Sequence, residues 1–120
     1  MTDIEKLSLI VKDFCEARDW DQFHDPKELS IGMSTEANEL LEIFRFKTKD
    51  QMEEMLKDPE IRKEVSGELA DIFYFLLRFS QMNNFDLEKC LLDKMERNKE
   101  RYTVEKSKGN NKKYSEDNQA

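Results

Sequence analysis

Both prolines in this chain directly follow an aspartate, at Asp25-Pro26 and at Asp58-Pro59. Aspartate is a favoured N-cap residue and proline is tolerated at the first helical position, so each dipeptide predicts the start of a helix. After each of them, apolar residues recur every three or four positions, as on one face of a helix. Because the 120 residues include only two prolines and three glycines, few other residues would interrupt a helix. The chain is therefore expected to be all-α.

The apolar periodicity predicts four main helices joined by short connections. They cover about residues 3–18, 26–45, 59–82 and 87–102, with a short extra helix between 48 and 56. Residues 18–25 lose the period and are expected to form a loop that carries large aromatic side chains. The predicted fold is an antiparallel four-helix bundle in a single domain over residues 1–104. A polar, flexible tail is expected over residues 105–120.

The third predicted helix contains an unbroken apolar run from Phe73 to Leu77. A surface helix normally shows a single apolar stripe, and a bundle of this size has little room for a fully enclosed helix. We therefore expect a second face of this helix to pack against a symmetry mate in a homo-oligomer. The residues expected to be buried are Leu29, Met33, Ala37, Leu40, Leu41 and Phe44 in the second helix, and Ile61, Val65, Leu69, Ile72, Phe73, Leu76 and Phe79 in the third.

The composition argues against several classes of function. A formal net charge of −7 does not favour nucleic-acid binding, which needs a basic footprint. No apolar stretch reaches transmembrane length and no signal peptide is recognised, so no membrane partner is expected. Cys15 and Cys90 form no C-x-x-C pattern and are expected to be reduced thiols in the cytoplasm. With His24 as the only histidine and three isolated glycines, a multi-histidine zinc site, a catalytic triad and a P-loop are not expected.

Two pairs of carboxylates lie within segments that otherwise resemble buried helices, at Glu36-x-x-Glu39 and Glu68-x-x-Asp71. Residues three apart share one face of a helix, so each pair presents two carboxylates together. Four carboxylates from two packed helices cannot all remain ionised near apolar surface without a cation, and oxygen-only ligation suits Mg²⁺ or Mn²⁺. One alternative is that these residues line solvated faces, because a chain with 27 acidic residues contains such pairs by chance. Another is a non-catalytic helical adaptor whose apolar third helix binds a partner.

The C-terminal part of the chain is more basic than the rest. It could bind a small polyanion together with the metal, or it could be a solvated helix end that continues into a loose tail. The basic residues there are Lys94, Arg97, Lys99, Arg101, Lys106, Lys108, Lys112 and Lys113.

Taken together, these motifs resemble the MazG-like superfamily of all-α nucleoside triphosphate pyrophosphohydrolases, and within it the dCTP pyrophosphatase-type branch. The resemblance covers about residues 5–115 in a consistent order. The segments that carry it are Arg18-Asp19-Trp20-Asp21-Gln22-Phe23-His24, Glu36 to Phe44, Gly67 to Ile72, Lys94 to Tyr102, and Lys112-Lys113-Tyr114.

The resemblance implies hydrolysis of (deoxy)nucleoside triphosphates between the α and β phosphates, which yields a nucleoside monophosphate and pyrophosphate. It implies a homo-dimer or homo-tetramer with sites at subunit interfaces, and a role in cleansing the nucleotide pool. Glu36, Glu39, Glu68 and Asp71 would be the Mg²⁺ ligands, with Mn²⁺ as a substitute ion. Glu36 and Glu39 would also be catalytic, with Glu36 the better candidate to orient or deprotonate the attacking water.

The substrate-binding residues expected from the resemblance fall into two groups. Those expected to contact phosphate are Lys94, Asn98, Arg101 and Tyr102, with Lys112 or Lys113 as additional candidates. Those expected to contact the base are Trp20, Phe46 and Phe75, whereas His24 is expected to be structural.

Three positions depart from the pattern of the branch. Val11, Phe46 and Phe75 stand where a histidine, a tryptophan and a tyrosine are expected. Each change removes a polar group that could discriminate between bases, so a broader or altered specificity that includes modified nucleotides is expected. A hydrolase of the same superfamily that acts on dUTP or phosphoribosyl-ATP is a further alternative.

Overall fold

The computed structural model describes residues 1–113, and these residues contain helices but no strand. The elements are α1 (Asp3–Ala17), the 3₁₀ turn η1 (Asp21–Phe23), α2 (Pro26–Phe44), α3 (Lys49–Met55), α4 (Pro59–Asn83), α5 (Leu87–Arg101) and α6 (Val104–Ser107). The predicted all-α class is confirmed, and the observed helix ends lie within a residue or two of those expected. Sequence reasoning missed η1, which lies inside the segment predicted to be a loop.

The two Asp-Pro dipeptides begin helices as predicted. The Asp25 side chain accepts a hydrogen bond from the backbone N–H of Glu28, and the Asp58 side chain accepts one from Glu60. At its other end, α4 stops at Asn84, which adopts the left-handed conformation with φ 61°. Asparagine tolerates this conformation better than most residues, so the expected break after α4 has a local cause.

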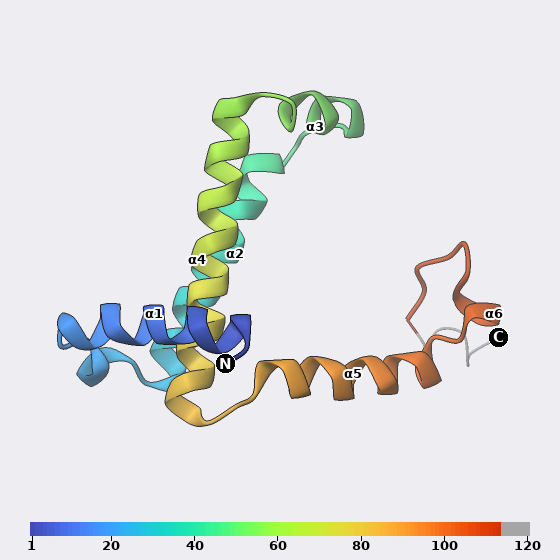
Figure 1. Cartoon of the computed structure of the whole chain (residues 1–120). Helices are drawn as coiled ribbons and strands as arrows, with labels where there is room; N and C mark the ends of the chain where they lie inside the picture. Colours follow the sequence, from blue (N-terminus) through green and yellow to red (C-terminus); the bar gives the residue numbers. More distant parts are fainter. Residues whose placement is uncertain (114–120) are drawn as a thin grey trace. The chain divides into compact units, whose positions relative to one another are not determined.

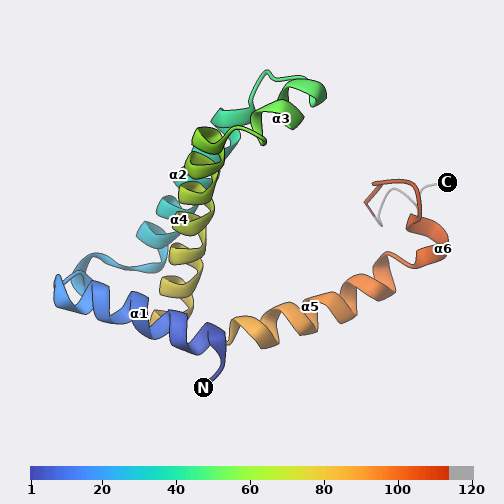
Figure 2. The ribbon, with the colours of Figure 1, turned by 45° about the horizontal axis from the view of Figure 1, so that its top comes forward.

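The chain divides into two compact units, residues 1–84 and residue 85 onward. In the first unit, α2 and α4 lie side by side and run in opposite directions, and α1 packs across the C-terminal end of α4 (Figures 1 and 2). The short helix α3 lies at the opposite end of the α2–α4 pair. The second unit contains α5, the fourth main helix that was predicted, and α6.

The expected division into a domain and a tail at residue 104 remains a prediction. Residues 104–107 form α6, so the start of the expected tail is helical. Tyr114 lies outside the described residues, as does the rest of the expected tail up to residue 120. Within residues 1–113, no helix combines the length and the apolar composition needed to cross a bilayer.

Few apolar side chains are fully buried within one chain. Cys15, Leu29 and Leu77 form the buried apolar core among the described residues, so the prediction for Leu29 is confirmed. The predicted burial of Leu41 and Leu69 is wrong for the single chain, because these side chains remain 56% and 54% exposed. The same correction applies to Ala37 and Phe73, which are also exposed. All four lie on surfaces of α2 and α4 that the described residues leave open to solvent.

Arg78, a buried arginine on α4, binds the segment that joins α1 to α2. Arg78 is only 1% exposed, and its guanidinium donates hydrogen bonds to His24 Nδ1 at 2.8 Å and to Gln81 Oε1 at 2.7 Å. It also forms an ion pair with Asp21. Burial and the charge of Arg78 lower the pKa of His24, which keeps the imidazole neutral and able to accept this hydrogen bond.

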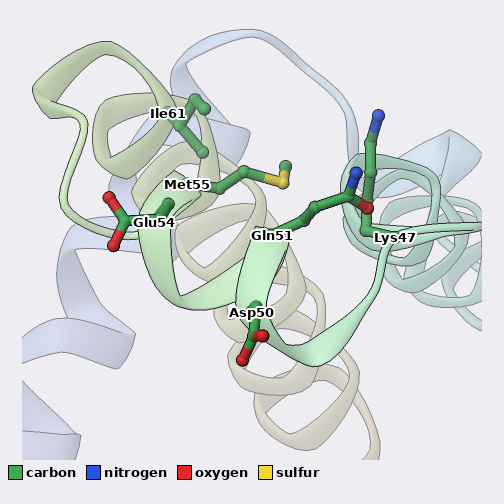
Figure 3. Close-up of a pocket in the computed structure, with 6 residues that line it drawn as sticks. All are labelled: Lys47, Asp50, Gln51, Glu54, Met55 and Ile61. Carbon is green, nitrogen blue, oxygen red and sulfur yellow. The ribbon is translucent and has the colours of Figure 1, made fainter.

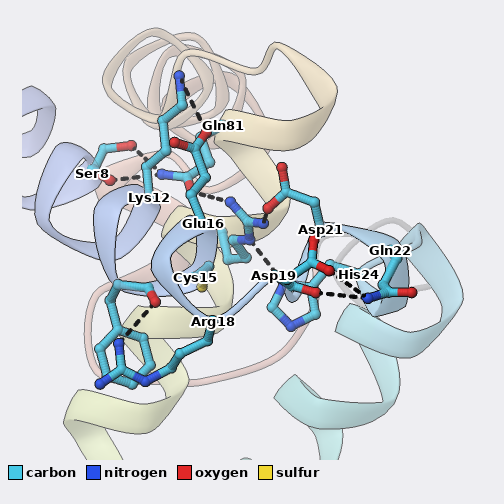
Figure 4. A network of polar contacts seen from close by, with 12 residues as sticks. Ser8, Lys12, Cys15, Glu16, Arg18, Asp19, Asp21, Gln22, His24 and Gln81 are labelled. Carbon is cyan, nitrogen blue, oxygen red and sulfur yellow. Dashed lines mark hydrogen bonds and ion pairs between the residues drawn. The ribbon is translucent and has the colours of Figure 1, made fainter.

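The same network reaches α1. The side-chain amide of Gln81 donates to the carbonyl oxygen and the hydroxyl of Ser8, at 2.7 and 2.8 Å (Figure 4). Part-buried polar contacts therefore hold both α1 and the segment that joins α1 to α2 against α4. This arrangement agrees with the structural role expected of His24.

Candidate metal centre

Three of the four predicted metal ligands lie together between α2 and α4. Glu36, Glu39 and Glu68 each offer a carboxylate oxygen, and these three oxygens all lie within 4.8 Å of one another. Glu36 and Glu39 share a face of α2 because they are three residues apart, and the antiparallel packing brings Glu68 of α4 to the same place. Two uninterrupted helices, each started by its own Asp-Pro cap, thus set the position of the cluster.

Two oxygens of this cluster are buried without a hydrogen-bond donor. Glu36 Oε2 and Glu68 Oε2 are inaccessible to solvent and have no hydrogen-bond partner. A buried polar atom without a partner is costly, and most such atoms in proteins are paired. A cation would satisfy both oxygens at once, so the residues present fit a bound metal ion.

The closeness of the carboxylates changes their protonation. The close approach of Glu39, then burial, and then the neighbouring Glu68 and Asp71 raise the pKa of Glu36 from the usual 4.5 to about 7. Burial is the main cause that raises the pKa of Glu68. Without a cation Glu36 therefore takes up a proton near neutral pH, whereas a divalent cation would favour the ionised carboxylates.

Asp71, the fourth predicted ligand, is close to the cluster, and its side chain is exposed like that of Glu39. Its charge helps to raise the pKa of both Glu36 and Glu68, yet its side chain is exposed and is not among the three gathered oxygens. All four predicted ligands offer carboxylate oxygens, which are the ligands that hard divalent cations such as Mg²⁺ and Mn²⁺ prefer.

The neighbouring acidic residues have other surroundings. Glu42, one turn beyond Glu39, is exposed and pairs with Arg45 at 3.0 Å. Glu64 is also exposed, and it lines an open groove of about 540 Å³. The lining residues of this groove are Glu60, Ile61, Lys63, Glu64, Gly67 and Glu68. A ligand in this groove would therefore contact one member of the carboxylate cluster.

A second open groove shares Ile61 with the first. It measures about 530 Å³ and combines apolar side chains with polar ones from α3 and the segment before it (Figure 3). Its lining residues are Lys47, Asp50, Gln51, Glu54, Met55 and Ile61. The first groove follows α4 from Glu60 to Glu68, and the second groove contacts α4 at Ile61.

The three aromatic residues expected to contact the base lie at different places in the first unit. Trp20 is half-buried and lies edge-on to Phe14, with 5.5 Å between ring centroids. Phe46 is 89% exposed, with the Arg45 guanidinium 4.7 Å from its ring centroid, and it has a φ of 65° that is uncommon for a large side chain. Trp20 precedes α2 and Phe46 follows it, so one chain does not bring these two rings together. Phe75 is half-buried on α4.

The residues expected to contact phosphate belong to the second unit. They lie on α5 and at its end, at the three- and four-residue spacings that place side chains on one helix face. These residues are Lys94, which is exposed, and Asn98, Arg101 and Tyr102, which are half-buried. Their contact with phosphate remains a prediction, as does that of the exposed Lys112 and Lys113.

Sequence reasoning missed Arg78 as a structural residue. The available signal was an arginine directly after the apolar run that ends at Leu77, a position where a charge is rarely buried without partners. The fold and the cluster together define an all-α protein with a carboxylate centre between two antiparallel helices.

Comparison with known proteins shows the family of this chain. A family model described as the MazG-like family matches residues 31–116, and the chain belongs to this family. dCTP pyrophosphatase 1 from Rattus norvegicus is 30% identical over 113 residues, which are 94% of this chain and 66% of that protein. The protein of the same name from Bos taurus is 32% identical over 94% of this chain and 67% of its own length. The chain thus spans about two thirds of these relatives.

A solved structure also supports the fold. The crystal structure of a pyrophosphatase from Archaeoglobus fulgidus is similar to this chain with a TM-score of 0.80 and 32% sequence identity. The similarity covers 86% of this chain and 94% of the archaeal one. The predicted resemblance to MazG-like proteins and the predicted fold class are therefore confirmed.

Proposed function

We propose that this protein is a divalent-metal-dependent nucleoside triphosphate pyrophosphohydrolase. The observation that carries the proposal is the carboxylate cluster, in which Glu36 and Glu68 each hold a buried oxygen without a partner. The names of the relatives and of the archaeal structure, all pyrophosphatases, support the same reaction class. The reaction would release pyrophosphate and a nucleoside monophosphate.

Glu36, Glu39, Glu68 and Asp71 would hold Mg²⁺, or Mn²⁺ in its place. When bound, the ion would supply positive charge that offsets the carboxylates and the triphosphate, and it would lower the pKa of a water bound to it. Glu36, with support from Glu39, would accept the proton of the water that attacks the α phosphorus. The bond from the α phosphorus to the bridging oxygen then breaks, and pyrophosphate leaves with the electron pair.

The remaining predicted residues would bind the rest of the nucleotide. Lys94 and Arg101 would neutralise phosphate oxygens and the leaving pyrophosphate, while Asn98 and Tyr102 would donate hydrogen bonds. The rings of Trp20, Phe46 and Phe75 are the proposed contacts of the base. Because apolar Phe46 and Phe75 offer the base no polar side-chain group, we propose that the enzyme accepts dCTP and modified deoxynucleotides, in keeping with nucleotide-pool cleansing.

We also propose that the enzyme is a homo-dimer or homo-tetramer. Large apolar side chains remain exposed on both long helices of the first unit, including Leu41 and Leu69 at more than half of their surface. A site that uses both Trp20 and Phe46 would need two chains, because these residues flank opposite ends of α2. We expect sedimentation equilibrium to give two or four times the 14.4 kDa mass of the chain. A monomer at micromolar concentration would contradict this proposal.

A cytoplasmic location fits the chemistry of the cysteines. Cys15 and Cys90 are both free thiols in the structure, as expected in a reducing compartment. The net charge of −7 argues against nucleic acid as a partner. Cell fractionation followed by detection of the protein in the soluble or the membrane fraction would test the location.

The function is tested by pyrophosphate release from a panel of the eight common nucleoside and deoxynucleoside triphosphates and 5-substituted dCTP analogues, with Mg²⁺ or with EDTA. We expect release that depends on the metal, with the highest kcat/KM for one or a few deoxynucleotides. Failure of a folded, oligomeric protein to release pyrophosphate from any of these substrates would contradict the proposal and favour the helical adaptor.

A further inference from the structure

The backbone of α2 at Gly32 lies directly against the ring of Phe75 on α4. A methyl group added at Gly32 would lie 2.4 Å from both Cε1 and Cζ of Phe75, and 3.0 Å from Cδ1. Carbon atoms in ordinary contact are about 3.5–4.0 Å apart, so even alanine would force the ring or the helices to move by about 1 Å. Gly32 is therefore required for the close approach of α2 and α4 at this point.

This contact lies one helical turn from Glu36 of the carboxylate cluster on α2, and about two turns from Glu68 of the cluster on α4. Gly32 precedes Glu36 by four residues, and Phe75 follows Asp71 by four, so each pair shares a helix face. Because α2 and α4 run in opposite directions, the contact is on the same side of the cluster for both helices. A change in the distance between α2 and α4 at Gly32 would therefore also change the distance between the two helices at Glu36.

We propose that Gly32 and Phe75 are a positioning pair that sets the separation of α2 and α4 at the carboxylate cluster, and thereby the affinity of the cluster for a divalent cation. The inference rests on the metal site of the proposed function and deepens it. Neither residue needs to touch the ion. Their role is to hold Glu36, Glu39 and Glu68 at a mutual distance from which one ion can contact all three.

The surroundings of Phe75 limit the freedom of its ring to move away from Gly32. Its neighbour Tyr74 lies edge-on to it with 5.0 Å between ring centroids, and the Tyr74 hydroxyl is within 3.1 Å of the buried Cys15 Sγ. Helix geometry further restricts an aromatic residue to two common χ1 rotamers. A methyl group at Gly32 would therefore act mainly by separating the helices.

A small change in separation matters because metal sites tolerate little error. Ligand distances in well-formed sites stay within about 0.2 Å of their preferred values. A shift of about 1 Å between α2 and α4 would remove Glu68 from the reach of an ion held by Glu36 and Glu39. The affinity for the divalent cation should then fall by about 10- to 100-fold, as it does when a residue that orients a metal ligand is removed.

The test is calorimetric titration of the full chain with Mn²⁺ in the absence of nucleotide, so that the proposed contact of Phe75 with a base does not affect the result. Gly32→Ala is expected to weaken Mn²⁺ binding by about 10- to 100-fold. Adding Phe75→Leu, which removes the clashing Cε1 and Cζ atoms, should restore affinity to within about threefold of the wild type.

Gly67→Ala is the matched control, because the same change on α4 places a methyl group that meets no atom within 4 Å. It should leave Mn²⁺ affinity unchanged and raise the melting temperature, since alanine is the better helix former. If Gly32→Ala does not fold, the Phe75→Leu single variant is compared with the Gly32→Ala and Phe75→Leu double variant. The proposal requires these two proteins to bind Mn²⁺ with equal affinity, and unequal affinity would overturn it.

Different results would contradict the role of Gly32 and Phe75 and the metal site itself. Wild-type affinity in Gly32→Ala, or lost affinity that Phe75→Leu does not restore, would overturn the positioning pair while the metal site stands. A wild-type protein that binds no Mn²⁺ would overturn the metal site, and the positioning role with it.

Discussion

Glu68→Gln is expected to lower the rate of pyrophosphate release by about a thousandfold, while the metal-free protein becomes more stable. A bound metal ion contributes several kcal/mol of charge stabilisation, and each 1.36 kcal/mol corresponds to a factor of ten in rate. Glutamine keeps the size of the side chain but removes the charge. Glu68 Oε2 is buried without a partner, and Glu36 and Glu39 lie within 4.8 Å, so the loss of one charge relieves repulsion when no ion is present.

The measurement combines steady-state pyrophosphate release with thermal unfolding in EDTA. Glu42→Gln is the control, because Glu42 lies on α2 outside the cluster and forms an exposed ion pair with Arg45. Such a pair contributes little, so this variant should keep activity and stability near those of the wild type. Full activity in Glu68→Gln, or equal loss in both variants, would contradict the assignment of the cluster as the metal centre.

Arg78→Met is expected to have the largest effect on stability outside the metal centre. Methionine matches much of the length of arginine but removes its hydrogen bonds to His24 and Gln81 and its ion pair with Asp21. Breaking a buried ion pair costs about 3–5 kcal/mol, and the half-exposed side chain of Asp21 reduces this to about 2–3 kcal/mol. Urea unfolding monitored by circular dichroism would measure the difference.

The same variant should change the titration of His24. Burial and the Arg78 charge both lower the pKa of His24 in the folded protein, so removal of the charge should raise that pKa toward its usual value. Proton NMR of the single histidine would detect the shift. Arg62→Met, at an exposed arginine that donates to the carbonyl of Leu56 at 3.0 Å, should change stability by less than about 0.5 kcal/mol. Equal stability of Arg78→Met and the wild type would contradict the anchoring role of Arg78.

The helices were predictable because their signals are local. Asp25 and Asp58 act as N-caps within their own first turns, and Asn84 ends α4 through its own backbone conformation. Apolar periodicity also predicted which faces of α2 and α4 carry apolar side chains. Periodicity could not show whether the same chain covers those faces. The described residues leave Leu41 and Leu69 on them exposed.

The candidate site was predictable to the extent that it depends on helix geometry. Three-residue spacing placed Glu36 and Glu39 on one face, but only the packing of α2 on α4 decides that Glu68 joins them and that Asp71 does not. The contacts of Arg78 with His24 and Asp21 join residues 54 and 57 positions apart in the chain, so no local pattern could reveal them. The need for glycine at position 32 likewise arises from Phe75 on another helix.

We propose that this chain hydrolyses a nucleoside triphosphate between its α and β phosphates at the Glu36, Glu39 and Glu68 cluster. The most direct measurement is ³¹P NMR of a preferred deoxynucleoside triphosphate incubated with the protein and Mg²⁺. We predict resonances of the nucleoside monophosphate and of pyrophosphate in equal amounts, and none of either product with EDTA. Formation of nucleoside diphosphate and inorganic phosphate would place the cleavage at the β–γ bond and contradict the account.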